Sequence, residues 1–211
     1  ERHTREYLPF EVYAKSLQEY FRNYEQTAGD WERHHSRMYP ILDQYQRDGY
    51  GALLKIGGKF GGAFLCDGVG LGKTFVGLML IERLVKFERK KVLLIVPKSG
   101  REPVWESALR TYLPELFGVF SNLVVINHTD LQRGGGWVER LQRIKDQADV
   151  VVVDEAHHFR NPSTKKDTSR YWQMQDLAKD KQVLTLTATP INNRLIDLQH
   201  LIEHFTQRDA G

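Results

Sequence analysis

The segment D-G-V-G-L-G-K-T, residues 67–74, combines three glycines with a lysine and a threonine. Glycines have no Cβ, so backbone N–H groups can turn inward and approach phosphate oxygens, while Lys73 supplies a charge for the β- and γ-phosphates. The Thr74 hydroxyl can ligate Mg²⁺, and the start of a helix favours anions. The usual phosphate loop, G-x-x-x-x-G-K-[ST], has glycine where this chain has Asp67. Taken alone, the segment fits either a nucleotide loop or a glycine turn that caps a helix.

A pair of acidic residues follows an apolar run further along the chain. In "VVVVDEAHHF", Asp154 and Glu155 stand at the end of an expected strand. An ATPase needs two carboxylates at such a point: one holds Mg²⁺, usually through water, and its neighbour polarises the attacking water. An isolated acidic pair is commonly a solvated turn, but here the lysine loop precedes it on a strand of its own. We therefore predict Lys73, Asp154 and Glu155 as catalytic residues.

The elements that must position these residues follow from hydrophobic periodicity. Short, continuously apolar segments predict strands at about 63–66, 91–96, 122–126, 149–153 and 182–187. Helical spacing predicts helices at about 12–24, 41–56, 73–88, 102–112, 137–146, 170–179 and 194–204. Buried strands alternating with helices indicate an α/β fold of three layers with a mostly parallel central sheet. Such sheets bind ligands outside the carboxyl ends of their strands, and Lys73, Pro97, Asp154 and Thr187 all lie at or just past a strand end.

Composition sets broad limits on function. The 211 residues are 41% hydrophobic and 27% charged, an ordinary globular balance. A net charge of +3 is compatible with nucleic acid without arguing for it. The single cysteine, Cys66, excludes a disulfide framework, is expected in a buried strand, and fits a reducing cytoplasm. The apolar runs are too short to span a membrane, so no membrane partner is expected. Because the chain starts at Glu1, it is interpreted as a piece of a longer protein.

The motifs together resemble a known family. "DEAH" with "TATP" (187–190) resembles helicase superfamily two, with its RecA-like motor lobes. "LCDGVGLGKT" looks like the Swi/Snf-type branch of DNA translocases, where an acidic residue commonly fills the first loop position, so Asp67 fits that branch. "YQRDG" resembles the upstream glutamine motif, "LLIVPKS…VWE" the next motif, "DEAHHFRNPST" the extended second motif and "LTATPINN" the third. The resemblance covers about residues 41–205, and bacterial Swi/Snf-like helicase-related proteins look most similar.

The resemblance implies roles for individual residues. It implies a RecA-like P-loop NTPase lobe over residues 41–211. Residues 1–40 carry no motif and are expected to form an N-terminal helical extension, either an addition to this family or part of an upstream domain. The implied nucleotide contacts are Gln46, which would recognise adenine, and Asp67, Gly68, Val69, Gly70, Leu71, Gly72, Lys73 and Thr74, with Mg²⁺ on Thr74 and Asp154. The implied coupling residues, which would link ATP hydrolysis to movement, are His157, Thr187, Ala188 and Thr189. The implied nucleic-acid contacts are Pro97 and Lys98. Independently of the resemblance, Lys165 and Lys166 lie in a basic stretch that fits a contact with a DNA backbone and a solvated loop equally well.

The implied activity is ATP hydrolysis coupled to movement on DNA, with duplex DNA as the expected partner. The chain departs from the family at Ala188, where glycine is frequent, and it stops soon after the third motif. The second RecA-like lobe, which carries the arginine fingers, is absent from these residues, so the fragment alone is expected to bind ATP weakly and hydrolyse it very slowly.

Three alternatives stay open at this point. An RNA-dependent DEAD/DEAH-type helicase would use the same chemistry on another polymer. The motor subunit of a restriction or phage-defence system would differ by an attached nuclease. An ATP-sensing binding module would do no mechanical work, and it would not need Glu155. A metal site on His157 and His158 is not expected, since no Cys/His set surrounds them, and His34 and His35 are expected on the surface.

Overall fold

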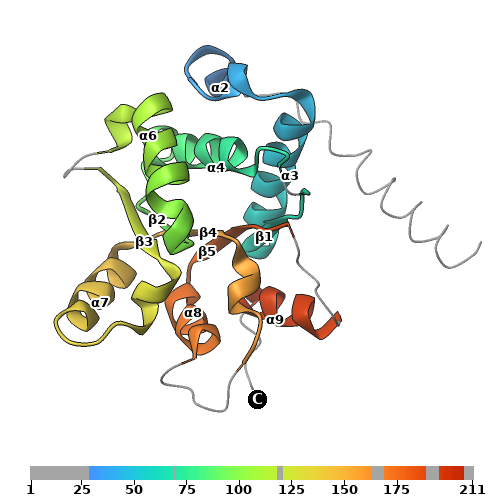
Figure 1. Cartoon of the computed structure of the whole chain (residues 1–211). Helices are drawn as coiled ribbons and strands as arrows, with labels where there is room; N and C mark the ends of the chain where they lie inside the picture. Colours follow the sequence, from blue (N-terminus) through green and yellow to red (C-terminus); the bar gives the residue numbers. More distant parts are fainter. Residues whose placement is uncertain (1–28, 69, 118–120, 163–168, 189–194, 207–211) are drawn as a thin grey trace, which may run out of the picture.

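The architecture is that of a parallel sheet between two layers of helices. The computed structural model describes residues 29–68, 70–117, 121–162, 169–188 and 195–206 (Figure 1). Within them, five parallel strands pair in the order β1-β5-β4-β2-β3. The strands are β1 (Gly62–Leu65), β2 (Val92–Val96), β3 (Leu123–Asn127), β4 (Val150–Asp154) and β5 (Gln182–Leu186). The predicted α/β fold with its parallel sheet is confirmed.

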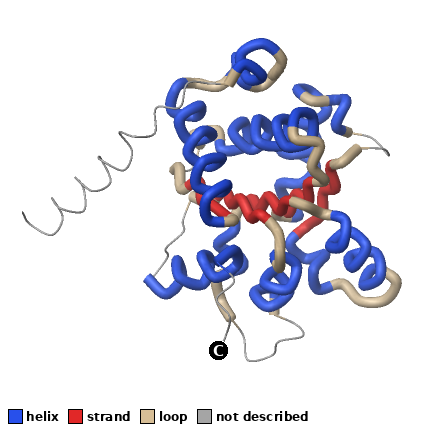
Figure 2. Tube along the Cα trace, turned by 180° about the vertical axis from the view of Figure 1, so that it is seen from behind, coloured by secondary structure: helices blue, strands red, loops and turns tan. Residues whose placement is uncertain are grey.

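The helices cover both faces of the sheet (Figures 1 and 2). One layer contains α3 (Gln44–Phe60), α4 (Lys73–Glu82) and α6 (Ser107–Tyr112), with α2 (Asp30–His34) outside it. The other layer contains α7 (Trp137–Gln147), α8 (Arg170–Ala178) and α9 (Leu195–Thr206). Short helical turns connect these elements: η1 (Tyr39–Ile41), η2 (Arg83–Phe87), α5 (Lys98–Gly100), η3 (Arg101–Glu106), η4 (Pro114–Leu116), η5 (His128–Gln132) and η6 (Ala156–Phe159).

Each face of the sheet has its own hydrophobic core, because successive side chains of a strand point to opposite faces. In β2, Val92 and Leu94 pack with the α3/α4/α6 layer, while Leu93 and Ile95 pack with the α7/α8/α9 layer. All four are buried, which explains why the strand is continuously apolar rather than alternating.

Three strands end level with one another at the carboxyl edge of the sheet. Leu186 of β5 pairs with Leu65 of β1 on one side and with Asp154 of β4 on the other. The amide of Thr187 then donates to the carbonyl of Leu65 at 3.0 Å, which joins the chain beyond β5 to the end of β1. The segments that follow these strands therefore start from one edge of the molecule.

The glycine-rich stretch "GGKFGG" differs from its prediction. We expected a helix to end before it, but α3 continues through Gly57 to Phe60 and ends at Gly61, which has φ +76°. Gly57 is buried, and a Cβ there would lie 2.7 Å from Cδ2 of Leu184. The glycine thus lets the helix approach β5 closely, so it serves helix–sheet packing rather than chain reversal.

His34 and His35 are exposed, as predicted. Cys66 follows β1 and is exposed, so its assignment to a buried strand was wrong. Partial desolvation and the charge of Asp67 raise the pKa of its thiol to about 11, so it stays protonated at neutral pH. The helix predicted over residues 12–24 lies outside the described residues.

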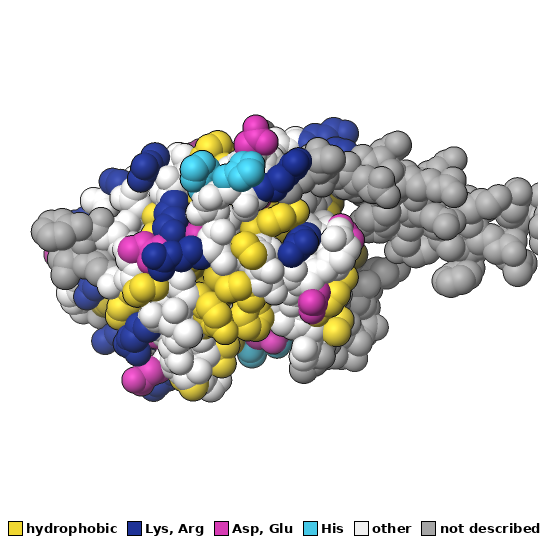
Figure 3. Space-filling model, turned by 90° about the horizontal axis from the view of Figure 1, so that it is seen from above, with side chains coloured by type: hydrophobic (Ala, Val, Ile, Leu, Met, Phe, Trp, Pro, Cys, Tyr) yellow, Lys and Arg dark blue, Asp and Glu magenta, His cyan; other side chains and the backbone are white. Residues whose placement is uncertain are grey.

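Seen from the side of α2 and α6, the surface mixes basic, acidic and hydrophobic side chains, with a hydrophobic group near its centre (Figure 3). Lys and Arg side chains are more widespread than Asp and Glu side chains on this face. In the described part of the chain, no helix combines the length and the apolar character that crossing a bilayer requires.

A buried carboxylate attaches the segment before α3 to the end of α4. Glu82 is fully buried and accepts hydrogen bonds from Ser36 Oγ at 2.6 Å, from the amides of Arg37 and Met38 at 2.9 and 3.1 Å, and from Lys86 Nζ at 3.0 Å. Met38 itself is completely buried in the core. Residues 29–40 therefore pack against the domain, while the proposed boundary at residue 40 stays a prediction.

Replacing Glu82 by alanine is expected to lower the free energy of unfolding by about 1.5–3 kcal/mol, the usual contribution of hydrogen bonds to a charged group. The Arg37 amide loses its acceptor, while Lys86 keeps its ion pair with Glu115 and the Met38 amide keeps the Ser36 hydroxyl. Urea unfolding followed by circular dichroism measures the effect. Glu102→Ala, at an exposed position, is the matched control and should stay within about 0.5 kcal/mol. A loss below about 1 kcal/mol for Glu82→Ala would contradict the buried-network interpretation.

Candidate nucleotide-binding site

The glycine loop spans the gap between β1, which ends at Leu65, and α4, which begins at Lys73. Gly70 and Gly72 have φ of +83° and +71°, the left-handed region that favours glycine. A Cβ at Gly72 would also lie 2.4 Å from Nε2 of Gln46, so the end of that side chain would have to move. The loop therefore favours glycine at this position mainly for its backbone conformation.

Gln46 lies against this loop from the first turn of α3. Its side chain is buried, its Nε2 donates to the carbonyl of Leu71 at 3.2 Å, and its Oε1 accepts from the amide of Asp43 at 3.0 Å. The hydroxyl of Tyr45 donates to the same Leu71 carbonyl at 3.0 Å. Two adjacent side chains of α3 thus hold the glycine loop, and the adenine-reading role of Gln46 stays a prediction.

Lys73 is folded back over the loop that precedes it. Its ammonium group donates to the carbonyls of Asp67 and Gly68 at 2.9 and 2.8 Å. Desolvation raises the pKa of the Asp67 carboxyl, and the positive charge of Lys73 opposes that rise. The first residue of α4 therefore places a cation beside backbone that an anionic ligand would approach, at a helix N-terminus that itself favours anions.

Asp154 is the last residue of β4 and is held by two hydrogen bonds. Its Oδ1 accepts from the amide of Glu155 at 3.0 Å, and its Oδ2 accepts from Nε1 of Trp105 at 2.8 Å. Burial raises the pKa of the Asp154 carboxyl and the charge of Glu155 adds to the rise, while the Trp105 hydrogen bond and the charge of Lys73 lower it. The Asp154 carboxylate and the Lys73 ammonium thus interact electrostatically at the same edge of the sheet.

Trp105 is a site residue that the sequence reasoning missed in this role. Its indole N–H donates to Asp154, and the side chain is completely buried. Its ring lies over Gly77 of α4, where a Cβ would be 2.5 Å from Cη2. Trp105 therefore joins the helix after the glycine loop to the acidic strand end. The contact spans 49 positions, and no local periodicity could reveal it.

Replacing Trp105 by phenylalanine is expected to weaken the apparent Mg²⁺ affinity in ATP hydrolysis by about 10-fold or more, the lower end of the range for outer-shell partners of metal ligands. The smaller side chain keeps an aromatic ring but no N–H, so Oδ2 of Asp154 loses its donor and the pKa of the carboxyl rises further. A Mg²⁺ titration of ATP turnover in the full polypeptide measures the shift. Trp172→Phe, on α8 in the other helix layer, should leave the titration unchanged, and equal curves for both variants would refute the role.

Glu155 has an unusual backbone conformation. Its φ and ψ are +52° and +50°, the left-handed region that non-glycine residues rarely adopt. Nδ1 of His157 lies 3.0 Å from its Oε2, an ion-pair distance if the imidazole is protonated. The backbone after β4 thus turns sharply at the residue predicted to orient water, and His157 lies beside that carboxylate. The coupling role of His157 stays a prediction.

His128, in η5 after β3, is a second contact that the sequence reasoning missed. Its Nε2 lies 2.8 Å from the backbone carbonyl of Asp154. The residue is only 3% exposed, and its ring centroid lies 5.1 Å from that of His158 and 4.9 Å from that of Phe159. Desolvation lowers the pKa of His128 to about 4, so the ring is neutral at neutral pH.

The other predicted residues lie at the same edge or outside the described residues. Thr187 is buried at the end of β5, and Ala188 follows it half-buried. Pro97 is half-buried after β2, and Lys98 is exposed at the start of α5. Four predicted residues lie outside the described part of the chain: Val69, Lys165, Lys166 and Thr189.

The available donors suit a magnesium nucleotide better than a metal held by protein alone. In the described residues, no group of three or more His, Cys, Asp or Glu side chains is arranged to hold a metal ion. Mg²⁺ is commonly bound through one or two protein oxygens together with phosphates and waters. The Asp154 carboxylate and the Thr74 hydroxyl, in the first turn of α4, are oxygen donors of that kind.

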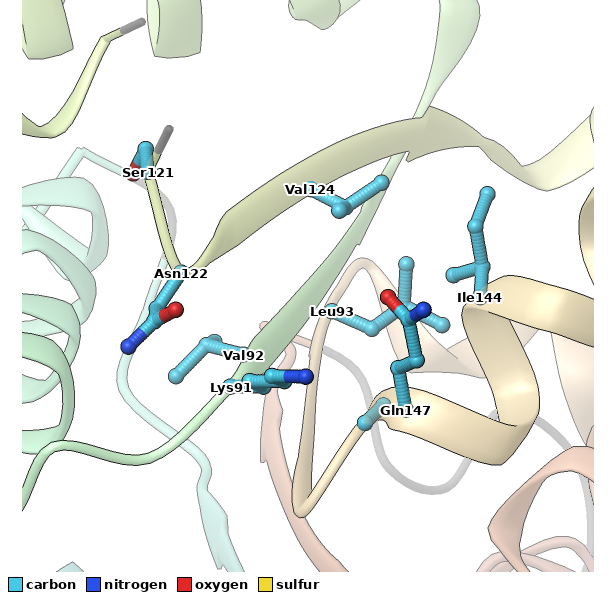
Figure 4. A pocket seen from close by; sticks show the side chains of 9 residues that line it. Lys91, Val92, Leu93, Ser121, Asn122, Val124, Ile144 and Gln147 are labelled. Atoms are coloured by element: carbon cyan, nitrogen blue, oxygen red, sulfur yellow. The ribbon is translucent and has the colours of Figure 1, made fainter. Parts of the chain in front are cut away.

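A cavity of about 230 Å³ lies away from these residues. Lys91, Asn122 and Gln147 surround it, with Val92 and Ile144 on its apolar side (Figure 4). It adjoins the amino ends of β2 and β3 and the end of α7, whereas the glycine loop and the acidic pair lie at the carboxyl edge. It therefore does not belong to the candidate nucleotide site.

Comparison with known proteins gives one consistent family. Residues 24–209 match the family described as SNF2-related domain. The chain is similar to an uncharacterized ATP-dependent helicase, YqhH, of Bacillus subtilis (strain 168), with 34% identity over 155 residues that cover 70% of this chain and 26% of that protein. It is also similar to the DNA repair and recombination protein RAD54B of Gallus gallus, with 27% identity, covering 77% of this chain and 20% of that protein.

Solved structures agree. The Sulfolobus solfataricus SWI2/SNF2 ATPase core in complex with dsDNA is similar with a TM-score of 0.60 and 25% identity, covering 78% of this chain and 35% of that one. The Sulfolobus solfataricus SWI2/SNF2 ATPase core domain gives a TM-score of 0.57 at 23% identity, covering 76% of this chain and 34% of that one, and supports the fold alone. The chain thus spans between a fifth and about a third of the relatives it matches.

Proposed function

The chain belongs to the SNF2-related family, and from that premise we propose that it is the first RecA-like, ATP-binding lobe of an ATP-dependent translocase that moves along duplex DNA. One observation supports this most directly. The glycine loop with Lys73, the acidic pair Asp154 and Glu155, and the end of β5 at Thr187 all lie at the carboxyl edge of one sheet, where such folds bind nucleotides.

Each residue has a role in this proposal. The amides of the glycine loop and the Lys73 ammonium bind phosphate oxygens, which would take the place of the Asp67 and Gly68 carbonyls on the Lys73 ammonium. Thr74 and Asp154 would hold Mg²⁺, which neutralises charge on the phosphates when it is bound. Glu155 orients the attacking water and accepts its proton. Gln46 reads adenine from the side of the glycine loop that it contacts.

Coupling to DNA is assigned to segments that leave the same edge. Thr187, Ala188 and Thr189, with His157, would transmit the loss of the γ-phosphate to a change in position against DNA. Pro97 and Lys98, together with Lys165 and Lys166, would contact the DNA backbone. Support comes from exposed Lys98 directly after β2 and from the similar ATPase core that was solved with dsDNA. A second RecA-like lobe of the same polypeptide would close over the nucleotide and supply arginine.

The polymer that activates hydrolysis tests the proposal. ATP turnover of the full polypeptide is measured with duplex DNA, single-stranded DNA and RNA at equal nucleotide concentration. The proposal expects duplex DNA to be the strongest activator. Activation by RNA alone would favour an RNA-dependent helicase. A motor of a restriction or defence system would also respond to duplex DNA, and cleavage of that DNA by the same polypeptide would identify it.

A further inference from the structure

The hydrogen-bond ladder between β2 and β4 leaves one carbonyl without its regular donor. In this parallel pair the amide of Val150 donates to the carbonyl of Lys91 at 3.2 Å, and the register runs from Val92 opposite Val150 to Ile95 opposite Val153. Every second residue of β4 bonds toward β2 in such a ladder. By this alternation, the backbone N–H and C=O of Asp154 point toward β2, and its carbonyl should accept a hydrogen bond from the amide of residue 97.

Residue 97 is proline, which has no amide hydrogen. The β2–β4 ladder accordingly stops at Ile95 and Val153, although β2 continues to pair with β3 for one residue more. A buried carbonyl that lacks a partner costs free energy comparable to a lost hydrogen bond. The imidazole of His128 takes this place, with Nε2 2.8 Å from the Asp154 carbonyl. Because a carbonyl only accepts, Nε2 carries the hydrogen.

This bond acts on the peptide unit between Asp154 and Glu155. The carbonyl end of that unit accepts from His128, and its amide end, the N–H of Glu155, donates to Oδ1 of Asp154 at 3.0 Å. The peptide plane is therefore held at both ends. Beyond it, Glu155 adopts the left-handed conformation, which costs about 1–3 kcal/mol and persists only where the surroundings enforce it. The direction in which the Glu155 side chain leaves the backbone depends on this plane.

We propose that His128 is a positioning residue for ATP hydrolysis: it supplies the hydrogen bond that Pro97 cannot, fixes the Asp154–Glu155 peptide plane, and thereby aims the Glu155 carboxylate at the attacking water. The inference rests on the proposed role of Glu155. His128 touches neither nucleotide nor water in this scheme, so it acts through the geometry of the strand end. Its ring also packs against His158 and Phe159, which fixes the position of the donor.

A matched pair of substitutions separates the hydrogen bond from the packing. His128→Gln keeps an N–H donor on an unbranched side chain, whereas His128→Met has similar size and no donor. In the full polypeptide with duplex DNA, H128M is expected to lower kcat by about 10- to 100-fold, the range for outer-shell partners of active-site groups. KM for ATP should change by less than about threefold, because ground-state binding is untouched, and H128Q should stay within about threefold of the parent kcat.

The proline provides an independent second test. Pro97→Ala restores an amide that can donate to the Asp154 carbonyl, and φ of −58° at this position is accessible to alanine. In a protein that already carries Pro97→Ala, adding His128→Met is expected to lower kcat by less than about threefold, because the restored amide replaces the imidazole as donor. The comparison with His128→Met alone forms a double-mutant cycle. A loss as large as in the unmodified background would overturn the proposal.

Controls distinguish this inference from the proposed function. Thermal unfolding of each variant must match the parent, and if H128M does not fold, His128→Phe replaces it and keeps the ring contacts. Equal losses in H128M and H128Q would show that His128 matters only for packing, and no loss in either would also overturn the inference. Glu155→Gln is measured alongside. If Glu155→Gln leaves turnover unchanged, the proposed function fails. If Glu155→Gln is inactive while the His128 variants keep the parent turnover, only the inference on His128 fails.

Discussion

Replacing Glu155 by glutamine is expected to lower ATP turnover of the full polypeptide by about 10² to 10⁴-fold, the usual contribution of a positioned general base. Glutamine keeps the size and the hydrogen-bonding capacity of the side chain but cannot accept a proton from water. Because Lys73 and the glycine loop are unchanged, nucleotide binding should persist. Steady-state turnover and the equilibrium binding of a fluorescent ATP analogue together measure the separation of the two effects.

The control for this substitution is Glu139→Gln, which removes an exposed carboxylate of α7 that has no role in the proposed site and should leave turnover unchanged. If Glu155→Gln hydrolyses ATP at the parent rate, Glu155 is not the base. Such a result would favour a module that binds ATP without hydrolysing it.

The 211 residues alone are expected to hydrolyse ATP about 10³ to 10⁵-fold more slowly than the full polypeptide, the range attributed to an arginine finger. In the proposed motor, a second lobe brings arginine to the γ-phosphate, and the residues described here supply only the loop, the lysine and the acidic pair. The kcat of residues 1–211 and of the full polypeptide, both at saturating Mg-ATP with and without duplex DNA, gives the ratio.

A slow rate is informative only if the site is folded. Binding of the fluorescent ATP analogue to residues 1–211, and its loss in Lys73→Ala, establishes that the glycine loop is competent. Vigorous DNA-stimulated turnover by residues 1–211 would show that this chain needs no arginine from elsewhere, and the two-lobe proposal would then be wrong.

Much of the fold could be predicted from local pattern. The strand at 92–96 is fully buried on both faces, and its uninterrupted apolar sequence indicated a covered parallel sheet. The position of Lys73 and Asp154 after their strands followed from the same rule, since parallel strands place their carboxyl ends at one edge. Motif spacing therefore gave the approximate location of the site.

The contacts that organise the site could not be predicted in this way. The bonds from Trp105 and His128 to Asp154 join positions 49 and 26 residues apart, and they depend on how η3 and η5 pack after the sheet has formed. The end of α3 was predicted wrongly, at about residue 56, for a related reason. Gly57 has the residue type of a turn, but tertiary packing against Leu184 keeps it inside α3.

At position 155 the backbone conformation and the proposed chemistry favour different residue types. Its left-handed conformation suits glycine, whereas water activation requires an acid. Directed evolution that screened this domain for heat resistance alone would therefore tend to discard the acid at position 155 in favour of glycine. Stabilised descendants would have to be screened for turnover as well, because their melting temperatures would not disclose the loss.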